Sequence, residues 1–145
     1  MAQGDITVFN EAKQNISGLV NLSTTTDYSC MLITTLPTAA ATTPDTADFV
    51  QVSGTNYTAG GIALTTSWTE SGGTVTFGSS VNPSWTQSAG APTNIVAALI
   101  YSETAAGEDA IAFIDMTVDG GATPISLVDG DITITFTGGT IFTLA

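Results

Sequence analysis

The stretch IVAALIYSETAAGEDAIAFIDM, residues 95–116, decides the fold class of this chain. Its two runs at 95–101 and 110–114 carry apolar residues on both faces of an extended backbone. Strands of this kind lie at the centre of a sheet whose two faces are both covered. The link at 103–109 holds two Ala, one Gly and three acids, and it predicts an exposed hairpin loop. We therefore expect an antiparallel pair at the core of a sheet.

The remainder of the chain has the same character of short strands separated by turns. Further strands are expected at 6–9, 28–36, 62–66, 74–77 and 81–86. Gly-Gly pairs recur between them, and 27 Thr residues supply the β-branched side chains that strands favour. The pattern predicts an all-β fold in which the 145 residues form a single domain, as a β-sandwich, a jelly-roll-like fold or a barrel.

One short helix is expected close to the N-terminus. Apolar residues recur there at helical spacing, at Phe9, Ala12, Ile16 and Leu19. Asn10 is a suitable N-cap and Gly18 a suitable stop. Residues 1–28 are therefore interpreted as an arm of one strand and one helix. The Thr-, Ala- and Pro-rich segment 37–48 has no periodicity, and it predicts a loop that protrudes or packs on a neighbouring subunit.

The C-terminal segment predicts a hairpin of its own. Its large apolar residues fall on one face of each arm, Ile132, Ile134 and Phe136 on the first and Phe142 and Leu144 on the second. A slip of one residue would move a whole arm's set to the other face of the sheet. We therefore expect a three-residue loop at 138–140 with a bulge, which pairs Phe136 with Phe142.

The charge balance excludes several classes of function. The chain has 13 acidic residues, no His and a net charge of −12, and Lys13 is its sole Lys or Arg. Nucleic acids and anionic membranes are therefore not expected as partners, because both need cations to neutralise phosphates. Without His, neither a Ser-His-Asp relay nor a Cys/His zinc site can form. We expect no enzymatic activity, no cofactor and no bound metal.

Four large aromatic side chains are candidates for contact with a partner or a ligand: Tyr57, Trp68, Trp85 and Tyr101. Such rings can anchor a protein interface or stack on sugar rings. Packing or interface roles are favoured over glycan contact, because strands use aromatic residues in the same way.

Two groups of acidic residues were weighed as sites. Asp115, Asp119, Asp129 and Asp131 could offer oxygen ligands to calcium, but their Asp-Gly steps also signal turns, which we favour. Glu103, Glu108 and Asp109 share one expected loop. A glycosidase needs two carboxylates that face each other across a substrate, and acids on one solvated loop rarely meet that need, so no glycosidase is expected.

Cys30 lies within an apolar strand, and we expect a buried, unreactive thiol there.

Four stretches of the chain resemble a family of small virion structural proteins of tailed bacteriophages. They are GDITVFNEAK (4–13), VSGTNYTAGG (52–61), the central stretch 95–116 and GDITITFTGGTIFTL (130–144). Members of this family are similar to capsid decoration, or cement, proteins. The resemblance implies a protein made in the host cytoplasm and placed on the outer surface of the virion. It further implies the major capsid protein as partner and a homotrimer as the oligomeric state.

A capsid decoration protein is the function we expect, and two alternatives stay open. One is a structural component of the tail or fibre, and the other is a glycan-binding module on the virion surface. Because the outer surface of a capsid is frequently acidic, we expect residues 1–22, which hold the sole basic residue, to contact the capsid or the neighbouring subunit. The candidate interface residues are Ile6, Val8, Phe9, Lys13, Trp68 and Trp85.

Overall fold

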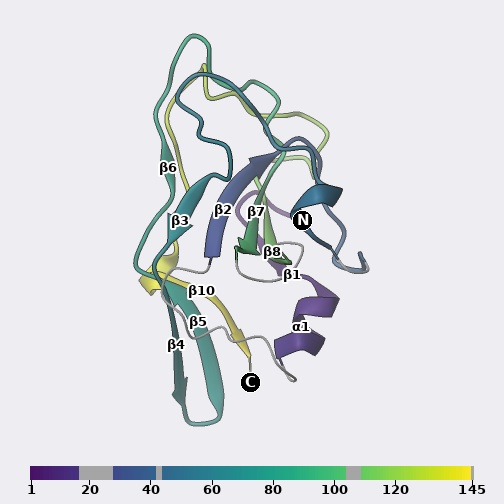
Figure 1. The fold of residues 1–145 in the computed structure, drawn as a ribbon, viewed down its shortest axis with the longest axis vertical. Helices are drawn as coiled ribbons and strands as arrows, with labels where there is room; N and C mark the ends of the chain where they lie inside the picture. Colours follow the sequence, from purple (N-terminus) through teal and green to yellow (C-terminus); the bar gives the residue numbers. More distant parts are fainter. Residues whose placement is uncertain (17–27, 42–43, 104–108, 145) are drawn as a thin grey trace.

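The predicted central hairpin forms the middle of the largest sheet (Figure 1). This computed structural model describes residues 1–16, 28–41, 44–103 and 109–144. Strand β7 (Ala97–Ser102) pairs antiparallel with β8 (Ala110–Asp115) on one side and with β2 (Tyr28–Ile33) on the other. Strands β1 (Ile6–Val8) and β3 (Ile62–Leu64) complete the order β1-β8-β7-β2-β3. Every residue of β2, β7 and β8 is buried, as their apolar sequences predict.

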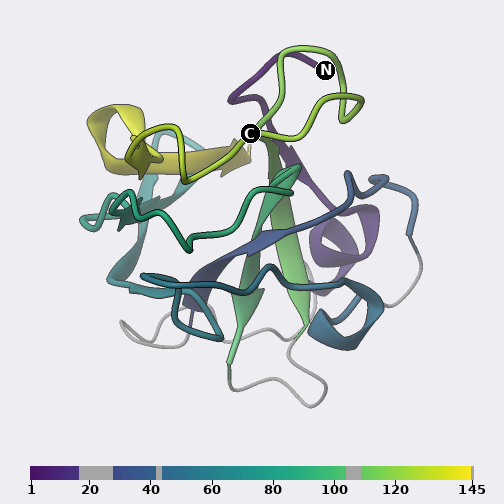
Figure 2. The same ribbon diagram turned by 90° about the horizontal axis from the view of Figure 1, so that it is seen from above.

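Two smaller antiparallel sheets lie on one side of this sheet. One has the order β10-β5-β4, with β4 at Thr66–Ser71, β5 at Thr74–Ser79 and β10 at Thr140–Leu144. The other pairs β6 (Ser84–Trp85) with β9 (Ile132–Thr133). Helix α1 (Asn10–Ile16) lies on the opposite side of the five-stranded sheet (Figure 2). The fold is therefore all-β and sandwich-like, as predicted, and its described part contains one α-helix.

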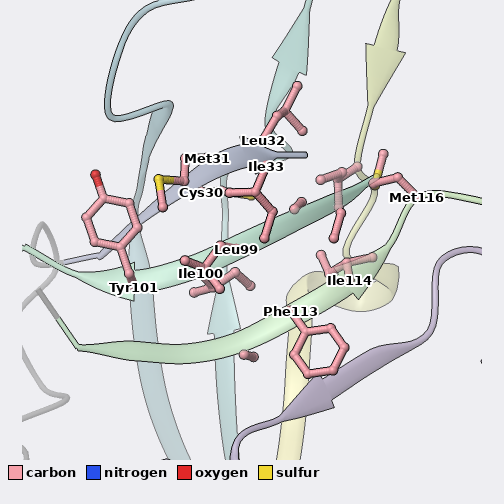
Figure 3. Close-up of a cluster of buried hydrophobic side chains, with 14 of the residues drawn as sticks. Cys30, Met31, Leu32, Ile33, Leu99, Ile100, Tyr101, Phe113, Ile114 and Met116 are labelled. Atoms are coloured by element: carbon pink, nitrogen blue, oxygen red, sulfur yellow. The ribbon is translucent and has the colours of Figure 1, made fainter. Parts of the chain in front are cut away.

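The core fills both faces of the five-stranded sheet. On one face Phe9 packs on Phe113, with ring centroids 5.1 Å apart. On the other face Tyr28 packs edge-on against Phe77 of the small sheet, also at 5.1 Å. Side chains from β2, β7 and β8 meet in one buried cluster (Figure 3). Because successive residues of a strand point to opposite faces, such a two-sided core requires strands that are apolar throughout.

Helix α1 begins at Asn10, the residue expected to cap it. The N–H of Lys13 donates to the carbonyl of Phe9 over 3.1 Å, so Phe9 takes the capping position and Asn10 is the first helical residue. The ring of Phe9 is fully buried, and this burial fixes the entry to the helix. The expected stop at Gly18 and the apolar Leu19 lie outside the described residues.

The segment 37–48 is irregular, as expected, and several of its described residues are exposed, but its two prolines are buried. Pro37 and Pro44 are buried, and the carbonyl of Pro44 accepts a hydrogen bond from the N–H of Ala110 over 2.8 Å. Asp45 caps a 3-10 turn at Thr46–Asp48 by accepting from the N–H of Ala47 over 2.9 Å. This part of the segment therefore packs on the start of β8, at Ala110.

Every expected strand differs from the structure by at least one residue in its bounds, and three differ most. The strand expected at 28–36 ends at Ile33. The strand expected at 62–66 is interrupted at Thr65, where the chain leaves β3 of the large sheet and enters β4 of the small one. Of residues 81–86, only Ser84–Trp85 form a strand.

The prediction of a C-terminal hairpin is wrong. Phe136 does not pair with Phe142, because β9 pairs with β6 and β10 pairs with β5. A 3-10 turn at Thr137–Gly139 carries the chain from one small sheet to the other. The expected bulge at 138–140 is therefore absent, and the register shift at Ile141 belongs to the pairing of β10 with β5. On the first arm Ile132, Ile134 and Phe136 are all buried, as their alternation predicts, but on the second arm Ile141 is buried and Phe142 and Leu144 are half-buried.

Candidate functional site

A groove of about 590 Å³ lies between the turn that precedes β3 and strand β6. One wall comes from the turn and the start of β3, and the other comes from β6 and the residue after it. The side chains and backbone that line it belong to Asn56, Tyr57, Thr58, Gly61, Ile62, Ser84, Trp85 and Thr86. None of these eight residues is acidic or basic, although the chain as a whole is strongly acidic.

Tyr57 is fixed in the first wall by its hydroxyl group. The hydroxyl oxygen accepts from the N–H of Leu32 and from the side-chain amide of Gln51, both over 2.9 Å. The bond to Leu32 satisfies a backbone N–H of β2 that lies beyond the last pair with β3, which joins Cys30 to Ile62 at the start of β3. Burial raises the pKa of Tyr57 above its ordinary value of 10.0, so the hydroxyl is neutral at physiological pH.

The turn that carries Tyr57 is held at both of its ends. The hydroxyl of Tyr101 donates to the carbonyl of Gly60 over 2.9 Å. Gly61 lies so close to β2 that a Cβ there would be 2.0 Å from the carbonyl oxygen of Cys30. At the other end, the N–H of Thr55 donates to the carbonyl of Gly90 over 2.8 Å. The wall is therefore a rigid part of the fold.

The second wall is fixed by contacts with β9 and the residues that precede it. The hydroxyls of Ser84 and Thr133 lie 2.8 Å apart and share a hydrogen bond. After the strand, the N–H of Gln87 donates to the carboxylate of Asp131 over 2.7 Å. The side chain of Gln87 donates to the carbonyl of Val128 over 2.6 Å.

The groove brings together two of the four aromatic residues singled out from the sequence. The rings of Tyr57 and Trp85 stack on each other at its lining, with centroids 6.4 Å apart and an angle of 25° between their planes. Tyr101 lies behind the first wall, and Trp68 belongs to the small sheet, where it packs on Phe77 and Phe142. Trp85 is 3% exposed, and its indole Nε1 is buried with no hydrogen-bond partner among the described residues.

The residues expected at an interface are spread over three places. Ile6 and Val8 are half-buried on β1, and Lys13 is exposed on α1. Phe9 and Trp85 are core residues, so their side chains are not available to a partner on the surface. Trp68 is half-buried in the small sheet. Sequence reasoning could not separate these cases, because buried and exposed aromatic residues look alike in a short strand.

A second, smaller depression of about 210 Å³ lies beside β1. It is bordered by Gln3, Gly4 and Ile6, by Ile114 and Met116 at the end of β8, and by residues 133–135 at and after the end of β9. The side-chain amide of Gln3 donates to the carbonyl of Met116 over 2.9 Å, which fixes the N-terminal residues against the end of β8.

Asp119, one of the acidic candidates for a calcium site, accepts from the N–H groups of Ala122 and Thr123. Hydrogen bonds from the side chain of Thr123 and from these backbone groups hold the pKa of its carboxyl below its usual value. The interpretation of this Asp-Gly step as a turn is therefore confirmed. In the described ranges, no three His, Cys, Asp or Glu side chains come close enough together to hold a metal ion.

The remaining acidic candidates are partly outside the described residues, since Glu108 falls in 104–108. Glu103 is exposed and accepts from the buried hydroxyl of Ser29 over 2.5 Å. Asp109 forms an isolated bridge with Asp45. These contacts join the end of the central hairpin to its surroundings. Cys30 is fully buried, as expected, and burial raises the pKa of its thiol to about 12.

No protein-family model, no curated protein and no solved structure matches the chain. Within the described ranges, no helix has the length and apolar character needed to cross a membrane.

The remaining groove residues were missed by sequence reasoning. Asn56, Thr58, Ser84 and Thr86 are common turn and strand residues, and nothing in their spacing indicates that the two segments face each other. The one available signal of a structured turn in this region was the high density of Gly, Ser, Thr and Asn around Tyr57.

Proposed function

We propose that this protein is a non-enzymatic capsid decoration protein of a tailed bacteriophage. It binds the outer surface of the assembled head as a homotrimer and joins adjacent capsomers. The proposal starts from the resemblance of the four sequence stretches to virion structural proteins of this kind. Three of those stretches contribute β1, the central hairpin, and β9 with β10, and the fourth, 52–61, forms the turn that precedes β3.

The observation that carries the proposal is the position of β1 at the edge of the five-stranded sheet. Among the described residues, no strand pairs with the outer edge of β1. Ile6 and Val8 are half-buried there, and the depression beside Ile6 contains no acidic side chain. An open edge with apolar residues is a surface to which another chain can add.

Charge supports the same surface as the contact. The chain carries a net charge of −12, and its one cation, Lys13, is exposed on the helix that follows β1. Residues 1–16 also hold the acids Asp5 and Glu11, so the N-terminal edge is not a basic surface, but Lys13 gives it the one basic side chain with which the chain can meet an acidic capsid surface.

The first experiment counts this chain in purified particles of its virus by quantitative peptide mass spectrometry. A copy number comparable to that of the major capsid protein, with the chain present on heads that lack tails, supports the proposal. A few copies per particle, confined to tails, would overturn it in favour of a tail or fibre component.

The second experiment measures binding to purified heads by co-sedimentation. Because Phe9 is a core residue, deletion of the whole arm would disturb the fold, and point changes are preferable. Ile6→Glu and Lys13→Glu each place a negative charge on the proposed contact, and Thr69→Glu places the same charge on exposed β4. We expect both N-terminal variants to bind about tenfold more weakly and Thr69→Glu to bind normally. Equal binding by all three variants would remove the N-terminal edge as the contact.

A further inference from the structure

We infer that the groove between the Tyr57 turn and β6 is a binding site for a neutral carbohydrate. This site is separate from the N-terminal edge proposed to contact the capsid, and its lining shares no residue with the depression beside β1. The inference therefore stands or fails independently of the proposed function.

The composition of the lining matches the surface of a sugar ring. The lining residues with polar side chains include Asn56, Thr58, Ser84 and Thr86, whose amide and hydroxyl groups can exchange hydrogen bonds with sugar hydroxyls. The half-buried ring of Tyr57 offers an apolar face to the C–H face of a pyranose, and the buried ring of Trp85 stacks on Tyr57 and supports it. A charged ligand is disfavoured, because the groove has no ionic partner for it and the net charge of −12 repels anions.

The groove is already formed in the unliganded chain. The side-chain amide of Asn56 donates to the backbone carbonyls of Thr86 and Gln87, each over 3.4 Å, and so links one wall to the other. Asn56 has a φ of 62°, a left-handed conformation that is uncommon outside glycine. Together with the fixed hydroxyl of Tyr57, this link means that a ligand would not have to order the walls on binding.

Tryptophan fluorescence tests the site directly. Trp68 and Trp85 are the two tryptophans, so a Trp68→Phe background leaves Trp85 as the single reporter. The full chain is titrated with cellobiose, maltose, lactose and N,N′-diacetylchitobiose, and with sialyllactose as the charged comparison. We expect a saturable change with at least one neutral sugar and none with sialyllactose. No saturable change with any neutral sugar, or an equal response to sialyllactose, would overturn the inference.

A matched pair of variants ties any binding to the groove. Thr86 is exposed and Asn56 bonds to its backbone carbonyl, so Thr86→Arg fills the groove while it keeps the wall contact. Thr69→Arg adds the same side chain on β4, which does not line the groove. We expect Thr86→Arg to weaken sugar binding about tenfold and Thr69→Arg to leave it unchanged. Equal affinity in both variants would place the binding elsewhere and refute this site.

Discussion

Trp68 of β4 lies directly opposite Phe77 of β5, with ring centroids 5.0 Å apart. Phe77 in turn faces Phe142 of β10 at 5.2 Å, so a row of three rings crosses the small sheet. Cross-strand aromatic pairs stabilise a sheet beyond the area that they bury. Since Phe77 also contacts Tyr28 of the large sheet, the row joins the two layers of the fold.

Trp68→Ala is expected to lower the free energy of unfolding by about 2–3 kcal/mol. This is less than the cost of removing a fully buried ring, because Trp68 is only half-buried. Urea unfolding followed by circular dichroism measures the change. The neighbouring Thr69→Ala, on the exposed face of the same strand, is the control and should stay within about 0.5 kcal/mol of wild type. An equal loss in both variants would show that the ring row contributes nothing specific.

Gly61→Ala is expected to destabilise the fold severely, by about 3 kcal/mol or more. Its φ is +79°, and the added Cβ would be 2.0 Å from the carbonyl oxygen of Cys30, which is backbone and cannot move aside. Gly72→Ala is the matched comparison, since its φ is +60° but its surroundings are open. The second change should cost only the strain of a left-handed residue, about 1–2 kcal/mol. Thermal unfolding of both variants separates the close approach from the conformational strain.

Thr117→Val is expected to lower the free energy of unfolding by about 1–3 kcal/mol. The buried hydroxyl of Thr117 donates to the carboxylate of Asp115 over 2.7 Å and accepts from the N–H of Gly121 over 2.6 Å. Valine keeps the shape of the side chain but leaves the carboxylate of Asp115 and the N–H of Gly121 without this hydroxyl as a partner. Thr117→Ser retains the hydroxyl and should recover most of the loss. If the serine variant were no more stable than the valine variant, the hydrogen bonds would not be the cause.

Stability is expected to decline in alkaline solution because of Cys30. Its pKa is raised from 9.0 to about 12 in the folded chain, so the unfolded chain loses the thiol proton first. The contribution of the neutral Cys30 thiol to the free energy of unfolding is complete below pH 9 and is lost progressively as the pH rises from about 9 towards 12. Tyr57, whose pKa is also raised, acts in the same direction at higher pH.

Urea unfolding between pH 8 and pH 11 measures this dependence. A Cys30→Ala variant is less stable overall, but its stability should fall less steeply above pH 9, with the remaining slope due to Tyr57. The same burial predicts that a thiol reagent at pH 8 labels Cys30 only when urea unfolds the chain. Rapid labelling of the folded chain would contradict the buried position of the thiol.

The central hairpin could be predicted because its signal is local and two-sided. Residues 95–101 and 110–114 are apolar throughout, and only a strand covered on both faces accommodates such a run. The C-terminal hairpin failed for the opposite reason. The alternation at 132–136 showed which side chains face inward, but it held no information on which strand lies alongside, and β9 and β10 found partners far away in the sequence.

The groove could not be predicted from the sequence for the same physical reason. Tyr57 and Trp85 were recognised as candidates, but their stacking depends on how the turn before β3 meets β6. That meeting is set by non-local contacts, such as the link from Asn56 to the carbonyl of Thr86. Burial of Phe9 and of Trp85 likewise follows from tertiary packing and not from their immediate neighbours.

The strand order has a consequence for the rate at which the chain folds. The first strand pairs with β8 and the last strand pairs with β5, so both must wait for the middle of the chain. Closing such long loops costs chain entropy before any contact compensates for it, and folding dominated by distant pairings is slow. The hairpins β7–β8 and β4–β5 can form early, and β1 and β10 dock last. Until β1 and β10 dock, the edges of the two early hairpins stay open to other chains. The newly made protein is most prone to aggregate during that interval.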